Sequence, residues 1–115
     1  MDAHTDVEKT AWKKICERLH AKAQTLNEEL QIHVPSYDAR CYNFSAVRNA
    51  PPRAEVHLNF SAPNPCLFVS FESGREMASG MFRVEQDGRL VCSMNDAESS
   101  PEALVDEVLN YLKNR

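Results

Sequence analysis

Hydrophobic residues recur at alternating intervals of four and three in the first third of the chain, which is the spacing of one face of an α-helix. We therefore expect one long helix over residues 6–33, with Asp6 or Thr5 suited to cap its start. The residues of this stripe are Trp12, Cys16, Leu19, Ala23, Leu26, Leu30 and His33. Val34 precedes Pro35, and a residue before proline is pushed out of the α region, so the helix is expected to end there.

The middle of the chain alternates between hydrophobic and polar residues, which is the pattern of half-buried β-strands. We expect five strands, at residues 39–47, 55–62, 66–72, 81–86 and 89–94. Residues 73–80 contain two Ser-Gly pairs and are expected to form a short loop or a single turn. The residues expected on the inner face of the first three strands are Tyr42, Phe44, Ala46, Val56, Leu58, Phe60, Leu67, Val69 and Phe71.

The turn around Gly88 permits a prediction of the register between the last two strands. A two-residue Asp87-Gly88 turn would place their hydrophobic residues on opposite faces of the sheet. A three-residue loop, with Gly88 left-handed in a G1 bulge, keeps those residues on one face and is therefore preferred. The pairs that this loop predicts are Phe82 with Cys92, Val84 with Leu90, and an ion pair of Glu85 with Arg89.

A second amphipathic helix is expected near the end of the chain. Ser100 is suited to cap it, Pro101 to occupy its first position, and Glu102 lies in its first turn. Its hydrophobic stripe consists of Leu104, Val105, Val108, Leu109 and Leu112.

The element order α-β-β-β-β-β-α predicts an α+β fold in a single domain over residues 1–115. Short connections favour antiparallel neighbours. We therefore expect a two-layer sandwich, in which an antiparallel five-stranded meander carries the N- and C-terminal helices packed on one face. The strand order stays open, because the strand at 39–47 suits an edge as well as an inner position.

The face of the sheet without helices is the expected binding surface. Phe68, Met81 and Val91 would lie on it, and apolar residues on an open face indicate that something covers them. The candidate binding residues on this face are His57, Asn59, Phe68, Ser70, Met81, Arg83 and Val91.

Composition and charge argue against several function classes. The chain has 115 residues and a net charge of −4, without a cluster of Lys and Arg that would follow a phosphate backbone, so we expect no nucleic-acid partner. The longest apolar run, residues 66–69, is far too short to span a membrane, and the N-terminus has no signal peptide, so we expect a cytoplasmic protein without a membrane partner. Only three glycines are present, which leaves no phosphate-binding loop and no dinucleotide cofactor.

The cysteines give no sign of a metal site or a disulfide. They contain no C-x-x-C pair, and each lies among hydrophobic neighbours, so we expect buried free thiols at Cys16, Cys41, Cys66 and Cys92. Cys16 and His20 are four residues apart on a helix and could share a metal ion, but two ligands do not make a site. Packing is the favoured interpretation of this pair, and no metal is expected.

His57 is the titratable residue of greatest interest. In the register that pairs Phe60 with Leu67 it lies opposite Ser70, which would bring a base next to a nucleophile. A catalytic triad also needs an orienting carboxylate and an oxyanion hole, and the sequence has no glycine-rich loop that would supply one. We therefore expect no catalytic residue.

Binding is thus favoured over catalysis. We expect a small acidic protein-binding or adaptor domain, without enzymatic activity, that acts as a homodimer joined by the open sheet face or by exposed parts of the first helix. An alternative is a small-molecule-binding or enzymatic pocket on the open face, in which His57, Asn59, Ser70 and Arg83 would converge.

A second alternative comes from the fold. The order of elements, the acidity and the size resemble, at the level of the fold alone, the small dimeric chaperones of bacterial type III secretion. That resemblance implies a further helix between the third and fourth strands, where residues 73–80 leave room for a single turn at most.

Overall fold

One antiparallel sheet and two helices make up the fold. The computed structural model describes residues 6–25, 30–61, 66–74 and 76–113. Their elements are α1 (Asp6–Thr25), β1 (Ile32–His33), β2 (Asn43–Arg48), β3 (Ala54–Ser61), β4 (Cys66–Ser73), β5 (Glu76–Val84), β6 (Leu90–Cys92), β7 (Glu98–Ser99) and α2 (Pro101–Lys113). The strands follow one another across the sheet in sequence order. The meander thus has seven strands where five were expected, because the short β1 and β7 extend it at both edges.

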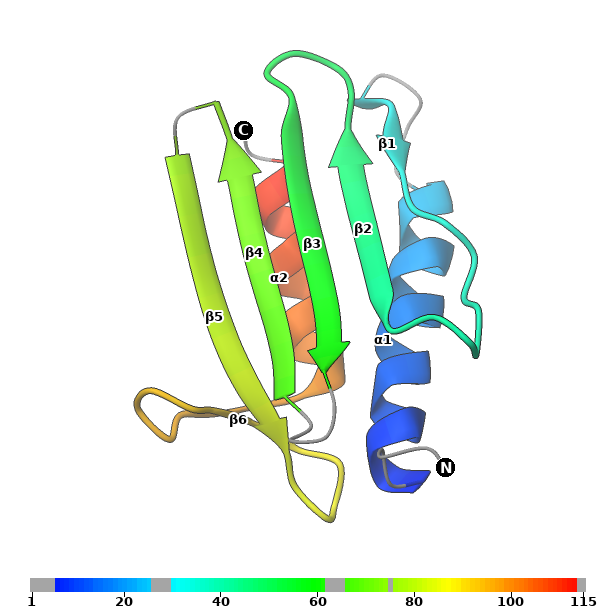
Figure 1. Ribbon diagram of the computed structural model, residues 1–115. Coiled ribbons are helices and arrows are strands. Elements are labelled where there is room, and N and C mark those ends of the chain that lie inside the picture. The colour runs from blue at the N-terminus through cyan, green and yellow to red at the C-terminus, as the bar shows by residue number, and fades with distance from the viewer. Residues whose placement is uncertain (1–5, 26–29, 62–65, 75, 114–115) are drawn as a thin grey trace.

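Both helices lie behind the same face of the sheet (Figure 1). Trp12 of α1 is buried and stacks on Phe60 of β3, with ring centroids 5.7 Å apart. Its indole Nε1–H donates a hydrogen bond to the Cys41 carbonyl oxygen at 3.0 Å, so the one polar atom of the ring keeps a partner in the core. The expected inner residues of β2, β3 and β4 pack against the helices, which confirms that the two terminal elements share one face.

The C-terminal helix is confirmed in detail. It starts at Pro101, and the Ser100 hydroxyl accepts a hydrogen bond from the Ala103 N–H at 3.1 Å as an N-cap. All five residues of its expected stripe are buried. A short repeat of hydrophobic spacing with a cap before it is therefore sufficient to define this element.

The first helix is shorter than expected. It ends at Thr25, and Ile32 and His33 form β1, which pairs with the end of β2. Gln31 has a φ of 51°, so the backbone there leaves the helical conformation before the proline is reached. The predicted helix to residue 33 is therefore wrong, and His33 is exposed in a strand. Leu26, also on the predicted stripe, lies outside the described residues.

The expected loop at residues 73–80 is also wrong. β5 begins at Glu76, and only two residues connect it with β4. Gly80 and Ser79 lie inside this strand, opposite Val69 and Ser70. The pairing with β4 outweighs the weak strand preference of the Ser-Gly pair. A two-residue connection has no room for the helix that the secretion-chaperone resemblance implies.

The bulged hairpin around Gly88 is confirmed. Gly88 has a φ of 88°, and the Glu85 N–H donates to the Arg89 carbonyl oxygen at 2.9 Å. The expected pairs of Phe82 with Cys92 and Val84 with Leu90 are present. The expected ion pair of Glu85 with Arg89 is not formed. Glu85 pairs instead with Arg83 at 2.9 Å, and Arg89 pairs with Asp87 of the loop at 2.7 Å and with Glu98 of β7.

Arg48 connects the end of β2 to the end of α2 through hydrogen bonds. Its side chain is 7% exposed, and Nη1 donates to the Leu112 carbonyl oxygen at 2.9 Å. Nε and Nη2 donate to the carbonyl oxygens of Ala50 and Pro51, both at 3.2 Å. A cation at the C-terminal end of a helix is favoured by the helix dipole, so this buried charge is compensated.

We predict that Gly88→Ala lowers the free energy of unfolding by about 1–3 kcal/mol, because a side chain at positive φ strains the backbone. A Cβ atom there would meet nothing within 4 Å, so the backbone alone causes the loss. Gly80→Ala is the matched control, since its Cβ would make an ordinary contact of 3.5 Å with the Phe82 ring. Urea unfolding measures both variants, and equal losses would contradict the role of Gly88.

Candidate functional site

The open face is the side of the sheet that neither helix covers (Figure 1). Because neighbouring strands pair in register, its side chains form rows across β2, β3, β4 and β5. The first row consists of Asn43, Asn59, Phe68 and Met81. The second row consists of Ser45, His57, Ser70 and Ser79. The third row consists of Val47, Glu55, Glu72 and Met77.

Two of the expected apolar binding residues are exposed side by side. Phe68 and Met81 are opposite each other on β4 and β5, and their side chains are 40% and 43% exposed. Val91 differs, because it is only 4% exposed although it also points to this face. In the register it lies between Arg83 and Glu98, whose charged side chains flank it.

The polar residues of the expected pocket are only partly brought together. His57 lies opposite Ser70, as the sequence predicts. His57 and Asn59 line a hollow of about 350 Å³, whose lining does not include Ser70 or Arg83. The Arg83 guanidinium bonds instead to Glu85 and Asp96 in ion pairs of 2.9 and 3.1 Å.

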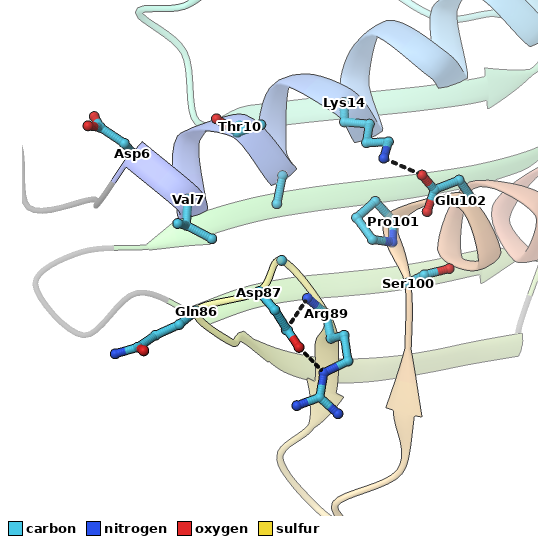
Figure 2. Close-up of a pocket in the computed structure, with 12 residues that line it drawn as sticks. Asp6, Val7, Thr10, Lys14, Gln86, Asp87, Arg89, Ser100, Pro101 and Glu102 are labelled. Carbon is cyan, nitrogen blue, oxygen red and sulfur yellow. Dashed lines mark hydrogen bonds and ion pairs between the residues drawn. The ribbon is translucent and has the colours of Figure 1, made fainter.

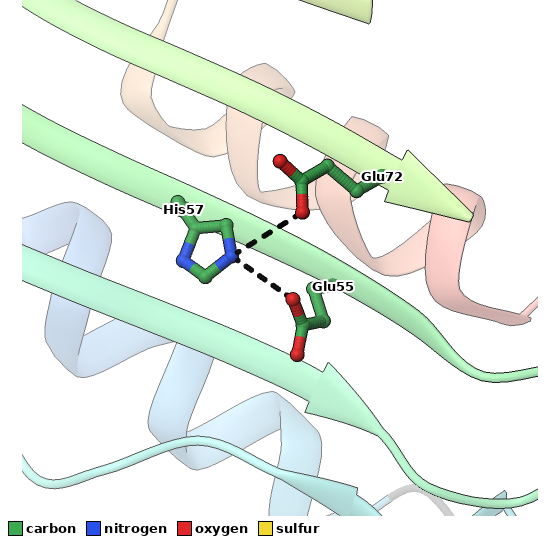
Figure 3. Close-up of side chains that lie close together, drawn as sticks. All are labelled: Glu55, His57 and Glu72. Carbon is green, nitrogen blue, oxygen red and sulfur yellow. Dashed lines mark hydrogen bonds and ion pairs between the residues drawn. The ribbon is translucent and has the colours of Figure 1, made fainter. Parts of the chain in front are cut away.

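Two glutamates join His57 in one cluster, which we call the Glu-His-Glu cluster (Figure 3). His57 Nε2 lies 3.2 Å from Glu55 Oε2 and 3.9 Å from Glu72 Oε2. Arg53 Nη2 contacts the other oxygen of Glu55, Oε1, at 2.6 Å. The hydrogen bond with His57, assisted by the Arg53 charge, lowers the pKa of Glu55 against the opposing effect of burial. These three side chains can hold a cation or share a proton.

The first half of β5 has a free backbone edge in the described part of the chain. β6 pairs only with residues 82–84 of β5, whereas β4 pairs along its other side from Glu76 onward. The Ser93 N–H, just after β6, donates to the Met81 carbonyl oxygen at 2.9 Å. Met81 is thus the last residue of β5 on this side that β6 and the turn after it contact. Residues 77–80 therefore border no described strand on that side, and Figure 1 shows this part of β5 as the outermost strand.

A hydrophobic groove of about 290 Å³ lies on the helix side of the same edge. Its apolar lining consists of Phe71, Ala78, Gly80, Phe82, Leu104 and Tyr111. The rings of Phe71 and Tyr111 meet edge to face, with centroids 5.0 Å apart. Because Ala78 and Gly80 belong to the free part of β5, the groove borders the free edge.

A larger hollow, of about 490 Å³, lies between the start of α1, the β5–β6 turn and the start of α2 (Figure 2). Its charged lining residues are three acids, Asp6, Asp87 and Glu102, and two bases, Lys14 and Arg89. Lys14 forms an ion pair with Glu102, and Arg89 forms one with Asp87. One acidic residue is in excess in this lining, so the hollow does not favour an anionic ligand.

The cysteines agree only in part with the expectation of buried free thiols. All four are free, but Cys16 alone is buried and Cys41 is exposed. Burial raises the pKa of the Cys16 thiol and makes it unreactive. His20, its expected partner in a metal pair, directs Nδ1 to the Val34 carbonyl oxygen at 2.9 Å. Cys16 thus fills the core, as the sequence favours.

No protein-family model, curated protein or solved structure matches this chain. Among the described residues, no helix combines the length and the apolar character that a membrane crossing requires. The candidate site therefore depends on the geometry of the chain itself.

We predict that His57→Ala raises the pKa of Glu55, because it removes the hydrogen bond that contributes most to lowering that pKa. An NMR titration of the Glu55 carboxyl carbon, in buffer with a chelator, measures the shift. His33→Ala is the control, since it removes an exposed histidine from a different strand. An unchanged Glu55 pKa in His57→Ala would show that the hydrogen bond is absent in solution.

Proposed function

We propose that this chain is a protein-binding domain that acts as a homodimer, in which the free edges of β5 pair with each other. The observation that carries this proposal is the edge of residues 77–80, which no described strand borders on the side away from β4. An exposed strand edge is a template for pairing with another strand, and proteins that leave one uncovered commonly use it.

The direction of the backbone groups supports the proposal. The Met81 carbonyl oxygen points to the β6 side, where it accepts the hydrogen bond from Ser93. Backbone groups of an antiparallel strand repeat their direction at every second residue. Met77 and Ser79 thus present their N–H and C=O groups to the free edge.

A second copy fits this edge better than an arbitrary strand. In an antiparallel pair centred on Ala78, Met77 of each copy lies opposite Ser79 of the other. The four N–H groups of these residues then donate to their four C=O groups across the interface. The small Ala78 side chains meet at the two-fold axis, where strands approach closely. Glu76 would face Gly80 of the second copy, so no like charges lie opposite each other.

Hydrogen bonds alone do not suffice for this dimer. Four of them contribute about 2–6 kcal/mol, whereas association costs about 4–15 kcal/mol. Burial of apolar surface supplies the difference, at roughly 25 cal/mol per Å². Two apolar surfaces can be buried in the dimer. Met77, 74% exposed, lies on the open face of the edge, and the hydrophobic groove lies on the helix side. We therefore expect a reversible dimer.

The same arrangement would enlarge the recognition surface. A two-fold axis perpendicular to the sheet keeps both open faces on one side, so the exposed Phe68 and Met81 pairs of two copies would face the same partner. The dispersion of Ser70 and Arg83 away from the hollow at His57 gives less support to a small-molecule pocket. The cytoplasmic location stays a prediction.

We predict that Ser79→Pro converts the dimer to a monomer, because it removes an N–H that points to the free edge. Proline is tolerated at such an edge position, since β4 does not use that N–H. Ser79→Ala is the matched control, which keeps the N–H and should stay dimeric. Sedimentation velocity over a range of concentrations measures the state, and circular dichroism verifies the fold.

Two outcomes would contradict this proposal. A monomeric wild-type chain at every concentration would exclude the homodimer. A Ser79→Pro variant that still forms the dimer would exclude the β5 edge as its interface and would favour the open face or α1. Slower amide exchange at Met77 and Ser79 with increasing concentration is the expected positive sign.

A further inference from the structure

We propose that Glu55, His57 and Glu72 bind one divalent transition-metal ion of the zinc type. The observations behind this proposal are separate from those behind the dimer, because they concern side chains of β3 and β4 and not the edge of β5. The ligands would be one imidazole nitrogen and two carboxylate oxygens. These three atoms already lie within 4.8 Å of one another.

The positions on the strands explain why the three side chains converge. Glu55 and His57 are two residues apart on β3, so they point to the same face of the sheet. Glu72 lies directly opposite Glu55 on β4. Two neighbours on one strand and one across from them form a triangle above the sheet, and Figure 3 shows the side chains directed to its centre. A flat sheet thus supplies three ligands from rigid elements.

The opposition of two carboxylates points to a cation at this place. Like charges directly opposite each other on neighbouring strands are destabilising. Arg53 compensates Glu55 but contacts only Oε1, which leaves Oε2 directed toward His57. Among the described residues, the one ion-pair partner of Glu72 is His57, at 3.9 Å. A dication between Oε2 of Glu55 and Oε2 of Glu72 would neutralise both carboxylates.

The donor set selects the class of metal. Imidazole favours zinc and its transition-metal neighbours, whereas magnesium and calcium prefer oxygen ligands. Arg53 holds the second oxygen of Glu55 and so orients this ligand from outside the metal site. Three protein ligands leave one position of a tetrahedral ion to water. A hollow of about 420 Å³, lined by Arg53, Glu55 and Glu72 among others, lies beside the cluster and gives room for that water or a small ligand.

The test measures zinc binding to the metal-free full-length chain by isothermal titration calorimetry. We expect one ion per chain, and an affinity at least about tenfold lower in His57→Ala and in Glu72→Gln, since even loss of an outer partner commonly costs that much. His33→Ala is the matched control and should bind as the wild type does. All three positions are at least partly exposed, so the variants should fold, which circular dichroism verifies.

The four free cysteines are the competing ligands, and a cobalt spectrum distinguishes them. Cobalt bound at the Glu-His-Glu cluster should show ligand-field bands without a thiolate charge-transfer band, and His57→Ala should lose those bands. No zinc binding, equal binding by wild type and His57→Ala, or a thiolate spectrum would each overturn the proposal. Magnesium should not compete with zinc at equal concentration, and competition would exclude an imidazole-dependent site.

Discussion

The register that Gly88 imposes on β5 and β6 determines the character of both faces of the sheet. Because its φ of 88° accommodates a bulged loop, Val84 meets Leu90 and the hydrophobic residues of both strands stay on the helix side. β6 is short and ends at Cys92, opposite Phe82. On the side away from β4, residues 77–80 of β5 therefore border no described strand. The loop at Gly88 thus fixes the packing on the helix side, and the short length of β6 leaves the free edge of β5.

The helices cover one face of the sheet and are joined to each other by an ion pair, and the second face stays uncovered. Lys22 of α1 bonds to Asp106 of α2 at 2.8 Å, and this bond lowers the pKa of Asp106. Arg48 then joins the end of α2 to the sheet. The acidic residues of α2 near α1 are thus used within the chain. On the open face, by contrast, Glu55 and Glu72 lie opposite each other.

The sequence predicts those parts of the fold that local pattern alone decides. The Ser100 cap and the hydrophobic spacing after it define α2, and alternation defines the inner rows of β3 and β4. It fails where tertiary pairing overrides local signals, because His33 has the spacing of a helix and Gly80 the chemistry of a loop, yet both pair in strands. Since residues 73–80 read as a loop, the β5 edge was not predictable. The Glu-His-Glu cluster was predictable, because the register that places His57 opposite Ser70 also places Glu55 opposite Glu72.

The edge and the cluster meet in one row of the sheet. Glu72 is the direct cross-strand neighbour of Met77, which lies on the free edge, so the two carboxylates stand close to the proposed interface. Two acidic chains that join there bring these charges nearer to each other, and Coulomb repulsion would weaken the dimer most at low ionic strength. A bound dication removes this repulsion without touching the backbone groups of Met77 and Ser79. Metal binding and dimerisation are thus physically separable, but they would favour each other through charge, and by linkage the dimer would hold the metal more tightly than the monomer does.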